Sequence, residues 1–270
     1  MKKLLMYYHR TIAVCMLALI SLVGCNNKED AVYYYNLQTK YVQGSVEEQH
    51  CLDKALELDS LYVDALIEKS VSYNKRGQFA IGMKFLNKGV ELDPIEHLGY
   101  RGFVKLYMLR DYSGALNDFL RLDELTPEFR DAPWGEDIYK VIGLSYLGMK
   151  EYKKALSYLK KSIEEVSKEN GEEWVESRTF IYYGVCAMKT QNLDDALQSF
   201  NTYIKYNPEN PSGYYYKAKL LLALGHSLDE DVKILLNTAL DLANKGFIET
   251  SPYFELPYQI YPSDIKQLLP

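Results

Sequence analysis

Residues Ser177–Asn210, SRTFIYYGVCAMKTQNLDDALQSFNTYIKYNPEN, contain the clearest copy of a pattern that recurs along the chain. The pattern predicts a helix, a turn, a second helix and a stop. It is carried by two aromatic residues, two small residues and a proline: Phe180, Phe200, Gly184, Ala196 and Pro208. These spacings predict two antiparallel helices that pack through small side chains, and a proline ends the second helix.

Similar units precede and follow this stretch. We place them at about Glu29–Tyr62, Val63–Glu96, His97–Phe129, Glu136–Glu169, Ser177–Asn210 and from Pro211 onward. The first unit matches weakly, as expected for an end repeat that has no neighbour on one side. In the third unit, the interval from Gly102 to Ala115 is one residue longer than the interval from Gly184 to Ala196. The helical register of the third unit therefore stays open.

The unit resembles the 34-residue tetratricopeptide repeat, whose pattern places an aromatic residue, a small residue, Ala, Phe and Pro at these positions. The resemblance implies an all-α fold, a right-handed superhelical solenoid of about six helix-turn-helix repeats over residues 31–245. It also implies a protein or peptide partner, because the first helices of such repeats line a concave groove. It implies no cofactor.

The first 24 residues are predicted to be a signal peptide. Positive charges near the start precede the uncharged run Thr11–Gly24, which is too short for a comfortable membrane span. The run ends Leu22-Val23-Gly24-Cys25, which resembles a bacterial lipobox. The resemblance implies lipidation of Cys25 and cleavage before it, with residues 25–30 as lipidated cysteine and short tether. An uncleaved anchor and an ordinary secretory leader are the alternatives.

The residues after Cys25 bear on the expected location. Asn26 rather than Asp follows the cysteine, which, by resemblance to enterobacterial sorting, favours the outer membrane. Lys28-Glu29-Asp30 resembles the charged export tags of Bacteroidetes surface lipoproteins, although a plain solvated linker is the alternative. The expected location is the cell envelope, and the choice between periplasmic and surface faces stays open.

The composition is that of a folded protein, with 47% hydrophobic and 25% charged residues. The net charge of −6 disfavours both nucleic acid and anionic lipid as ligands. We therefore expect no nucleic acid as a partner, and contact with membranes through the lipid anchor only. Cys51 and Cys186 lie on patterned helices far apart in sequence, and we predict buried free thiols.

No catalytic or metal-binding motif is present in the sequence. His50, His97 and His226 each stand alone in a different unit, and neither an HExxH pair nor a GxSxG elbow occurs. Acidic pairs such as Asp194-Asp195 lie on helical stretches, where they solvate an outer face or favour the helix dipole. We therefore predict that the protein is not an enzyme and binds no metal.

Mapped by resemblance to the repeat family, the groove would be lined mainly by apolar and aromatic side chains. The predicted groove residues are Tyr33, Leu37, Tyr41, Ile67, Val71, Lys75, Lys140, Leu144, Ile181, Val185, Met188, Tyr215 and Lys219. This lining favours an apolar segment or an amphipathic helix over an acidic C-terminus. We expect a lipid-anchored adaptor that helps to assemble an envelope complex. A glycan-binding surface lipoprotein that uses exposed tyrosines, and a purely structural spacer, are the alternatives.

Residues 246–270 depart from the repeat pattern. They contain four prolines among five aromatic residues, an irregular composition that often follows the last repeat. We expect this segment to cap the open edge of the solenoid. The alternative is a short linear motif that docks another protein.

Overall fold

A computed structural model describes residues 27–226 and 228–269 of the chain. Cys25 and the predicted signal peptide lie outside the described residues. The described part contains helices and turns and no strand, so the predicted all-α fold is confirmed. The chain divides into two compact units on either side of His97, and the structure describes residues 27–97 of the N-terminal unit and residues 98–226 and 228–269 of the C-terminal unit.

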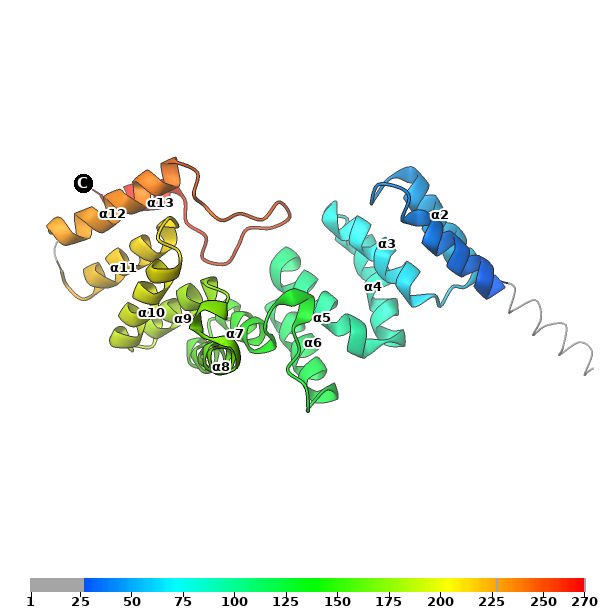
Figure 1. Ribbon diagram of the computed structural model, residues 1–270, viewed down its shortest axis with the longest axis horizontal. Helices are drawn as coiled ribbons and strands as arrows, with labels where there is room; N and C mark the ends of the chain where they lie inside the picture. Colours follow the sequence, from blue (N-terminus) through cyan, green and yellow to red (C-terminus); the bar gives the residue numbers. More distant parts are fainter. Residues whose placement is uncertain (1–26, 227, 270) are drawn as a thin grey trace, which may run out of the picture. The chain divides into compact units, whose positions relative to one another are not determined.

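The N-terminal unit contains two helix pairs, drawn from blue to cyan in Figure 1. Residues 27–38 are helical and are followed by α2 (Val46–Leu58), α3 (Val63–Lys75) and α4 (Phe79–Leu92). Its buried centre includes Leu52, Ala55 and Ala65. The Ser45 hydroxyl caps α2 by accepting a hydrogen bond from the Glu48 amide.

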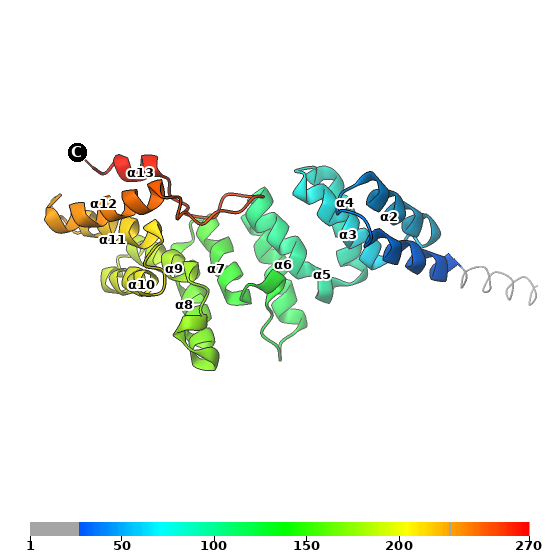
Figure 2. The same cartoon turned by 45° about the horizontal axis from the view of Figure 1, so that its top comes forward.

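The C-terminal unit continues the pairing of consecutive helices, as Figure 2 shows. Its elements are α5 (Pro94–Phe103), the π-helix η1 (Val104–Leu109), α6 (Tyr112–Leu125), η2 (Pro133–Gly135), α7 (Ile138–Gly148), α8 (Tyr152–Asn170), η3 (Glu172–Trp174), α9 (Arg178–Lys189), α10 (Leu193–Tyr206), α11 (Pro211–Ala223), α12 (Glu230–Asn244) and α13 (Pro262–Lys266). Helix α7 packs against α8, α9 against α10, and α11 against α12. We call α5 with η1, α7, α9 and α11 the first helices of these pairs.

Small residues let the paired helices approach each other. A methyl group added to Gly184 on α9 would overlap the Phe200 ring on α10, and one added to Gly102 on α5 would overlap the Phe119 ring on α6. Both phenylalanine rings are completely buried. The third and fifth repeats therefore use the same glycine–phenylalanine contact, and the predicted packing of paired helices through small side chains is confirmed.

The π-helix η1 explains the additional residue in the third repeat. A π-helix has one more residue in each hydrogen-bonded turn than an α-helix. The helix ends at Arg110, which has a left-handed backbone (φ 55°), as do Lys150 (φ 63°) and Gln191 (φ 66°) at the corresponding turns of the next two repeats. The turn that follows the additional residue therefore has the same backbone conformation as the turns of the next two repeats.

The C-terminal tail leaves α12, extends toward α5 and returns to α13 (Figures 1 and 2). Ile260 and Ile265 are buried in the same apolar cluster as Leu236 and Ala239 of α12. Between the two anchored ends, residues 249–258 form turns and irregular backbone. We call residues 249–258 the tail segment.

Both cysteines in the described residues are free and buried, as predicted. Burial raises the pKa of the Cys186 thiol to about 12, so this group is protonated at neutral pH. Among the described residues, none of the helices combines the length and apolar character that a membrane span requires.

Candidate functional site

The tail segment lies on side chains that come from three of the first helices. These side chains are Phe103 of α5, Tyr107 of η1, Arg110 at its C-terminus, Arg178 of α9 and Tyr216 of α11. We call this set the receiving face. Segments far apart in sequence therefore meet on one side of the C-terminal unit.

Aromatic contacts hold the middle of the tail segment. The Phe254 ring stacks on Tyr107 with a centroid distance of 4.8 Å and meets Phe103 edge-on at 5.7 Å. Such pairs contribute about 0.5–1.5 kcal/mol beyond the burial of their area. The next residue, Glu255, pairs with Arg110 at 2.9 Å. A hydrogen bond from the Tyr261 hydroxyl and the Arg110 guanidinium lower the pKa of the Glu255 carboxyl.

Arg178 holds the two flanks of the tail segment. Its Nη2 donates to the Pro257 carbonyl oxygen at 2.8 Å, and its Nη1 lies 3.4 Å from a Glu249 carboxylate oxygen. The Tyr216 hydroxyl donates to the Tyr258 carbonyl oxygen at 2.9 Å. Arg178 is only 2% exposed, and a charged group at this depth requires such partners.

A polar cluster lies beside Arg178 and continues toward η1. Lys140 of α7 is 3% exposed, and its ammonium lies 2.6 Å from Glu176 and 3.4 Å from Glu136. The Tyr107 hydroxyl donates to Glu136 at 2.6 Å. Burial by itself would lower the pKa of Lys140, but the two carboxylates outweigh it and raise that pKa. The cluster connects the residue that stacks on Phe254 to α7 and α9.

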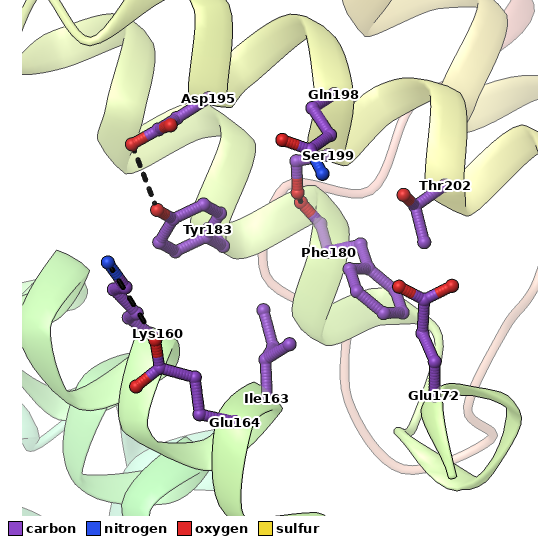
Figure 3. A pocket seen from close by; sticks show the side chains of 10 residues that line it. All are labelled: Lys160, Ile163, Glu164, Glu172, Phe180, Tyr183, Asp195, Gln198, Ser199 and Thr202. Carbon is purple, nitrogen blue, oxygen red and sulfur yellow. Dashed lines mark hydrogen bonds and ion pairs between the residues drawn. The ribbon is translucent and has the colours of Figure 1, made fainter. Parts of the chain in front are cut away.

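A separate cleft of about 220 Å³ opens between α8, α9 and α10 (Figure 3). Its apolar surface comes from Ile163 and Phe180, and the Tyr183 hydroxyl donates to Asp195 at 3.1 Å beside them. Burial and the Asp195 charge raise the pKa of Tyr183 to about 12. The cleft is smaller than the range of about 300–1,000 Å³ that is typical of small-molecule sites.

Six of the predicted groove residues are buried. They are Val71, Lys140, Leu144, Ile181, Val185 and Tyr215, with exposures from 0% to 7%. The prediction that these residues line an open groove is wrong. Ile181 and Val185 belong to the same buried cluster as Tyr216 of the neighbouring first helix and Ile260 of the tail. The prediction placed the tail at the open edge of the solenoid and did not include its packing against the first helices.

The other predicted groove residues keep some exposure. In the C-terminal unit, Met188 is half-buried and Lys219 is exposed, with its ammonium 5.5 Å from the centre of the Tyr215 ring. In the N-terminal unit, Tyr33, Tyr41 and Lys75 are exposed, whereas Leu37 and Ile67 are half-buried. Ile67 packs where Gly89 leaves room for it, so it contributes to helix pairing rather than to an open surface.

The sequence reasoning missed the polar residues that hold the tail. Arg178 and Tyr182 are one helical turn apart on α9, and Arg178 Nε donates to the Tyr182 hydroxyl at 3.0 Å. A charged residue on an otherwise apolar first helix was the signal that could have indicated them. Among the described residues, no group of three or more His, Cys, Asp or Glu side chains could hold a metal ion.

Comparison with solved structures identifies the fold. The chain is similar to PilF of Pseudomonas aeruginosa, with a TM-score of 0.59 and 17% identity over 84% of this chain and 96% of PilF. PilW, described as a widely conserved type IV pilus biogenesis factor, gives a TM-score of 0.61 and 14% identity over 83% of this chain and 96% of PilW. YrrB is described as a tetratricopeptide-repeat protein with an unusual peptide-binding site. It gives a TM-score of 0.53 and 19% identity over 72% of this chain and 92% of YrrB.

At these identities, the likeness establishes the fold: the chain is a tetratricopeptide-type helical solenoid. No family model and no curated protein sequence matches it. The fold prediction drawn from Ser177–Asn210 is therefore confirmed by structure rather than by sequence similarity.

Proposed function

We propose that this protein is a lipid-anchored adaptor that binds a segment of another protein and assists assembly of a cell-envelope complex. The observation that carries the proposal is that the first helices of the C-terminal unit already hold a non-helical peptide segment, the chain's own tail segment. Repeat solenoids bind extended peptides because stacked first helices offer a long complementary surface. The similarity to PilW, a pilus biogenesis factor, supports an assembly role.

The envelope location rests on the sequence. Cys25 follows a lipobox-like tripeptide, and the short tether after it would keep the repeats near a membrane surface. We place the protein at the outer membrane, with the face left open. Intact-mass analysis of the membrane fraction checks this location: the wild type is expected to lack residues 1–24 and to carry lipid at Cys25, and Cys25→Ser to lose both modification and membrane retention.

The adaptor role is tested by crosslinking in intact envelopes, with the mature protein as bait. One or a few proteins are expected to be recovered by the wild type and not by a bait that lacks Leu98–Pro270. Recovery of the same background proteins by both baits would contradict the proposal. The shortened bait is a valid control only if circular dichroism shows that its remaining helices are folded.

Glycan binding is the competing proposal, and Tyr33, at 61% exposure, is the residue that favours it. Against it, Tyr182, Tyr203, Tyr215 and Tyr216 of the C-terminal unit are buried. These rings are not available as sugar platforms. Retention of the purified protein on a glycan array, lost in Tyr33→Ala, would favour glycan binding over the adaptor role.

A further inference from the structure

We propose that the receiving face is a recognition site for an extended partner segment in which an aromatic residue is followed directly by a carboxylate, and that Phe254-Glu255 of the tail occupies this site until such a partner displaces it. This inference rests on the proposed adaptor function and specifies the partner that it takes.

The contacts of the tail define the chemistry of the partner. Tyr107 and Phe103 pack against one aromatic ring, and Arg110 donates to the neighbouring carboxylate. Arg110 is half-exposed in this pair, at 56%, so it is accessible to a carboxylate that arrives from solvent. An aromatic–acidic dipeptide is the shortest unit that satisfies both groups.

Two of the remaining contacts are made to the main chain of the bound segment, whereas Arg178 also pairs with the Glu249 side chain. Arg178 and Tyr216 donate to the main-chain carbonyl oxygens of Pro257 and Tyr258. Every residue of a peptide offers a main-chain carbonyl acceptor. The two consecutive carbonyls are bound by residues of different helices, α9 and α11, and Tyr258 has a left-handed backbone (φ 55°). A foreign segment that forms a similar turn can therefore replace these hydrogen bonds.

We infer that the tail segment can dissociate from the receiving face while the helices of the C-terminal unit stay folded. Its residues form no helix or strand, whereas Ile260 and Ile265 beyond it are buried in the core. Displacement therefore opens a loop that is anchored at both ends. When the loop opens, Arg178 keeps its hydrogen bond to the Tyr182 hydroxyl on the same helix, so its charge is not left without a partner.

Tethering sets how strongly the tail competes. A segment joined by a short flexible connection has an effective concentration on the order of 1 mM. A free peptide that binds the empty face with a Kd on the order of 10 µM would then bind the wild type roughly a hundredfold more weakly. A productive partner must exceed this competition by affinity or by local concentration at the membrane.

The test uses the mature chain in which Tyr253–Pro257 is replaced by Gly-Ser-Gly-Ser-Gly, so that Ile260 and Ile265 stay in place. The probe is a fluorescein-labelled peptide of residues 249–259, ETSPYFELPYQ. Fluorescence anisotropy is expected to show binding to the replaced variant and at least tenfold weaker binding to the wild type. Arg110→Ser in the replaced variant is expected to weaken binding, and Arg121→Ser, an exposed arginine on α6, to leave it unchanged.

The matched control probe carries Phe254→Ser and Glu255→Lys. If the replaced variant is folded by circular dichroism and binds neither probe, or binds both equally, the proposal is wrong. Hydrogen exchange provides a second readout on the unmodified chain: excess free peptide is expected to remove protection from residues 250–259, and unchanged protection would also overturn the proposal.

Two further outcomes locate a failure. If envelope crosslinking recovers a partner that the free peptide does not displace, the adaptor function stands and the receiving face is not its site. If light scattering shows a wild-type dimer that the loop replacement abolishes, the occupant is the tail of a second copy, and the assignment to a partner protein is overturned.

Discussion

Arg178 Nη2 donates to the Pro257 carbonyl oxygen at 2.8 Å, across 79 positions of sequence. This hydrogen bond joins the start of α9 to the tail segment, and the same guanidinium contacts Glu249 and Tyr182. A single buried side chain of α9 therefore contacts both flanks of the tail segment.

Replacing this side chain tests how strongly the tail is held. Arg178→Met is expected to lower the free energy of unfolding of the C-terminal unit by about 2–3 kcal/mol, since hydrogen bonds to charged groups contribute about 1.5–3 kcal/mol. Urea denaturation followed by tryptophan fluorescence measures it, because Trp134 and Trp174 both lie in this unit. Faster proteolysis within residues 249–258 should accompany the loss. Arg121→Met, on the exposed surface of α6, is the control and should change stability by less than about 0.5 kcal/mol.

The glycine–phenylalanine contact of the fifth repeat can be tested by adding one methyl group. Gly184→Ala is expected to destabilise the unit by about 1–3 kcal/mol, because the methyl group overlaps the Phe200 ring in a packed interior. The double variant Gly184→Ala with Phe200→Leu should recover part of that loss. Additive losses in a double-mutant cycle, measured by urea denaturation, would mean that the two residues do not pack against each other.

The π-helix should tolerate a deletion that an α-helix does not. Removing Met108 gives the third repeat the same glycine-to-alanine interval as the fifth, so an α-helix can replace η1. Removing Met188 from α9 instead shifts a helix that is already in register. Both residues are half-buried, which makes them a matched pair. Thermal denaturation followed by circular dichroism should show a higher midpoint for the Met108 deletion than for the Met188 deletion. Equal midpoints would argue against the interpretation of η1 as a one-residue insertion.

Acid should weaken the cluster around Lys140. Burial alone would raise the pKa of Glu176, but the Lys140 ammonium outweighs it, so the carboxyl has a pKa below its ordinary value of 4.5. A lowered folded-state pKa contributes stability above pH 4.5, which is lost as the pH falls through the folded-state pKa. Glu176→Gln is expected to cost about 1–2 kcal/mol at pH 7, less than for a fully buried pair because the Glu176 side chain is 47% exposed.

The difference in stability between the wild type and Glu176→Gln should shrink below pH 4.5, where the wild-type carboxyl becomes protonated. Urea denaturation at pH 7 and at successively lower pH values checks it. Glu173 is an exposed neighbour, and Glu173→Gln provides the control. The free energy of unfolding of this variant should equal that of the wild type at every pH. A difference that is constant with pH would exclude an ionic role for Glu176.

The amino-acid sequence was sufficient to predict the helix pairs. Residues of the same kind as Gly184, Ala196 and Phe200 recur in other repeats, at spacings that suit closely packed antiparallel helices. The local sequence pattern is therefore sufficient to predict such packing. The sequence also indicated that the third repeat contains an additional residue. It could not show that a π-helix accommodates it, because an insertion can also be placed in a turn.

The side chains that form the receiving face could not be identified before the packing of the helices and the tail was known. Ile181 and Val185 were predicted to line an open groove, but the neighbouring first helix and the tail contribute to the cluster that buries them. The contacts of Arg178 with Glu249 and Pro257 join residues that no helical period relates. Such long-range contacts depend on where the chain returns after the last repeat, and that position is set by the packing of Ile260 and Ile265 in the core.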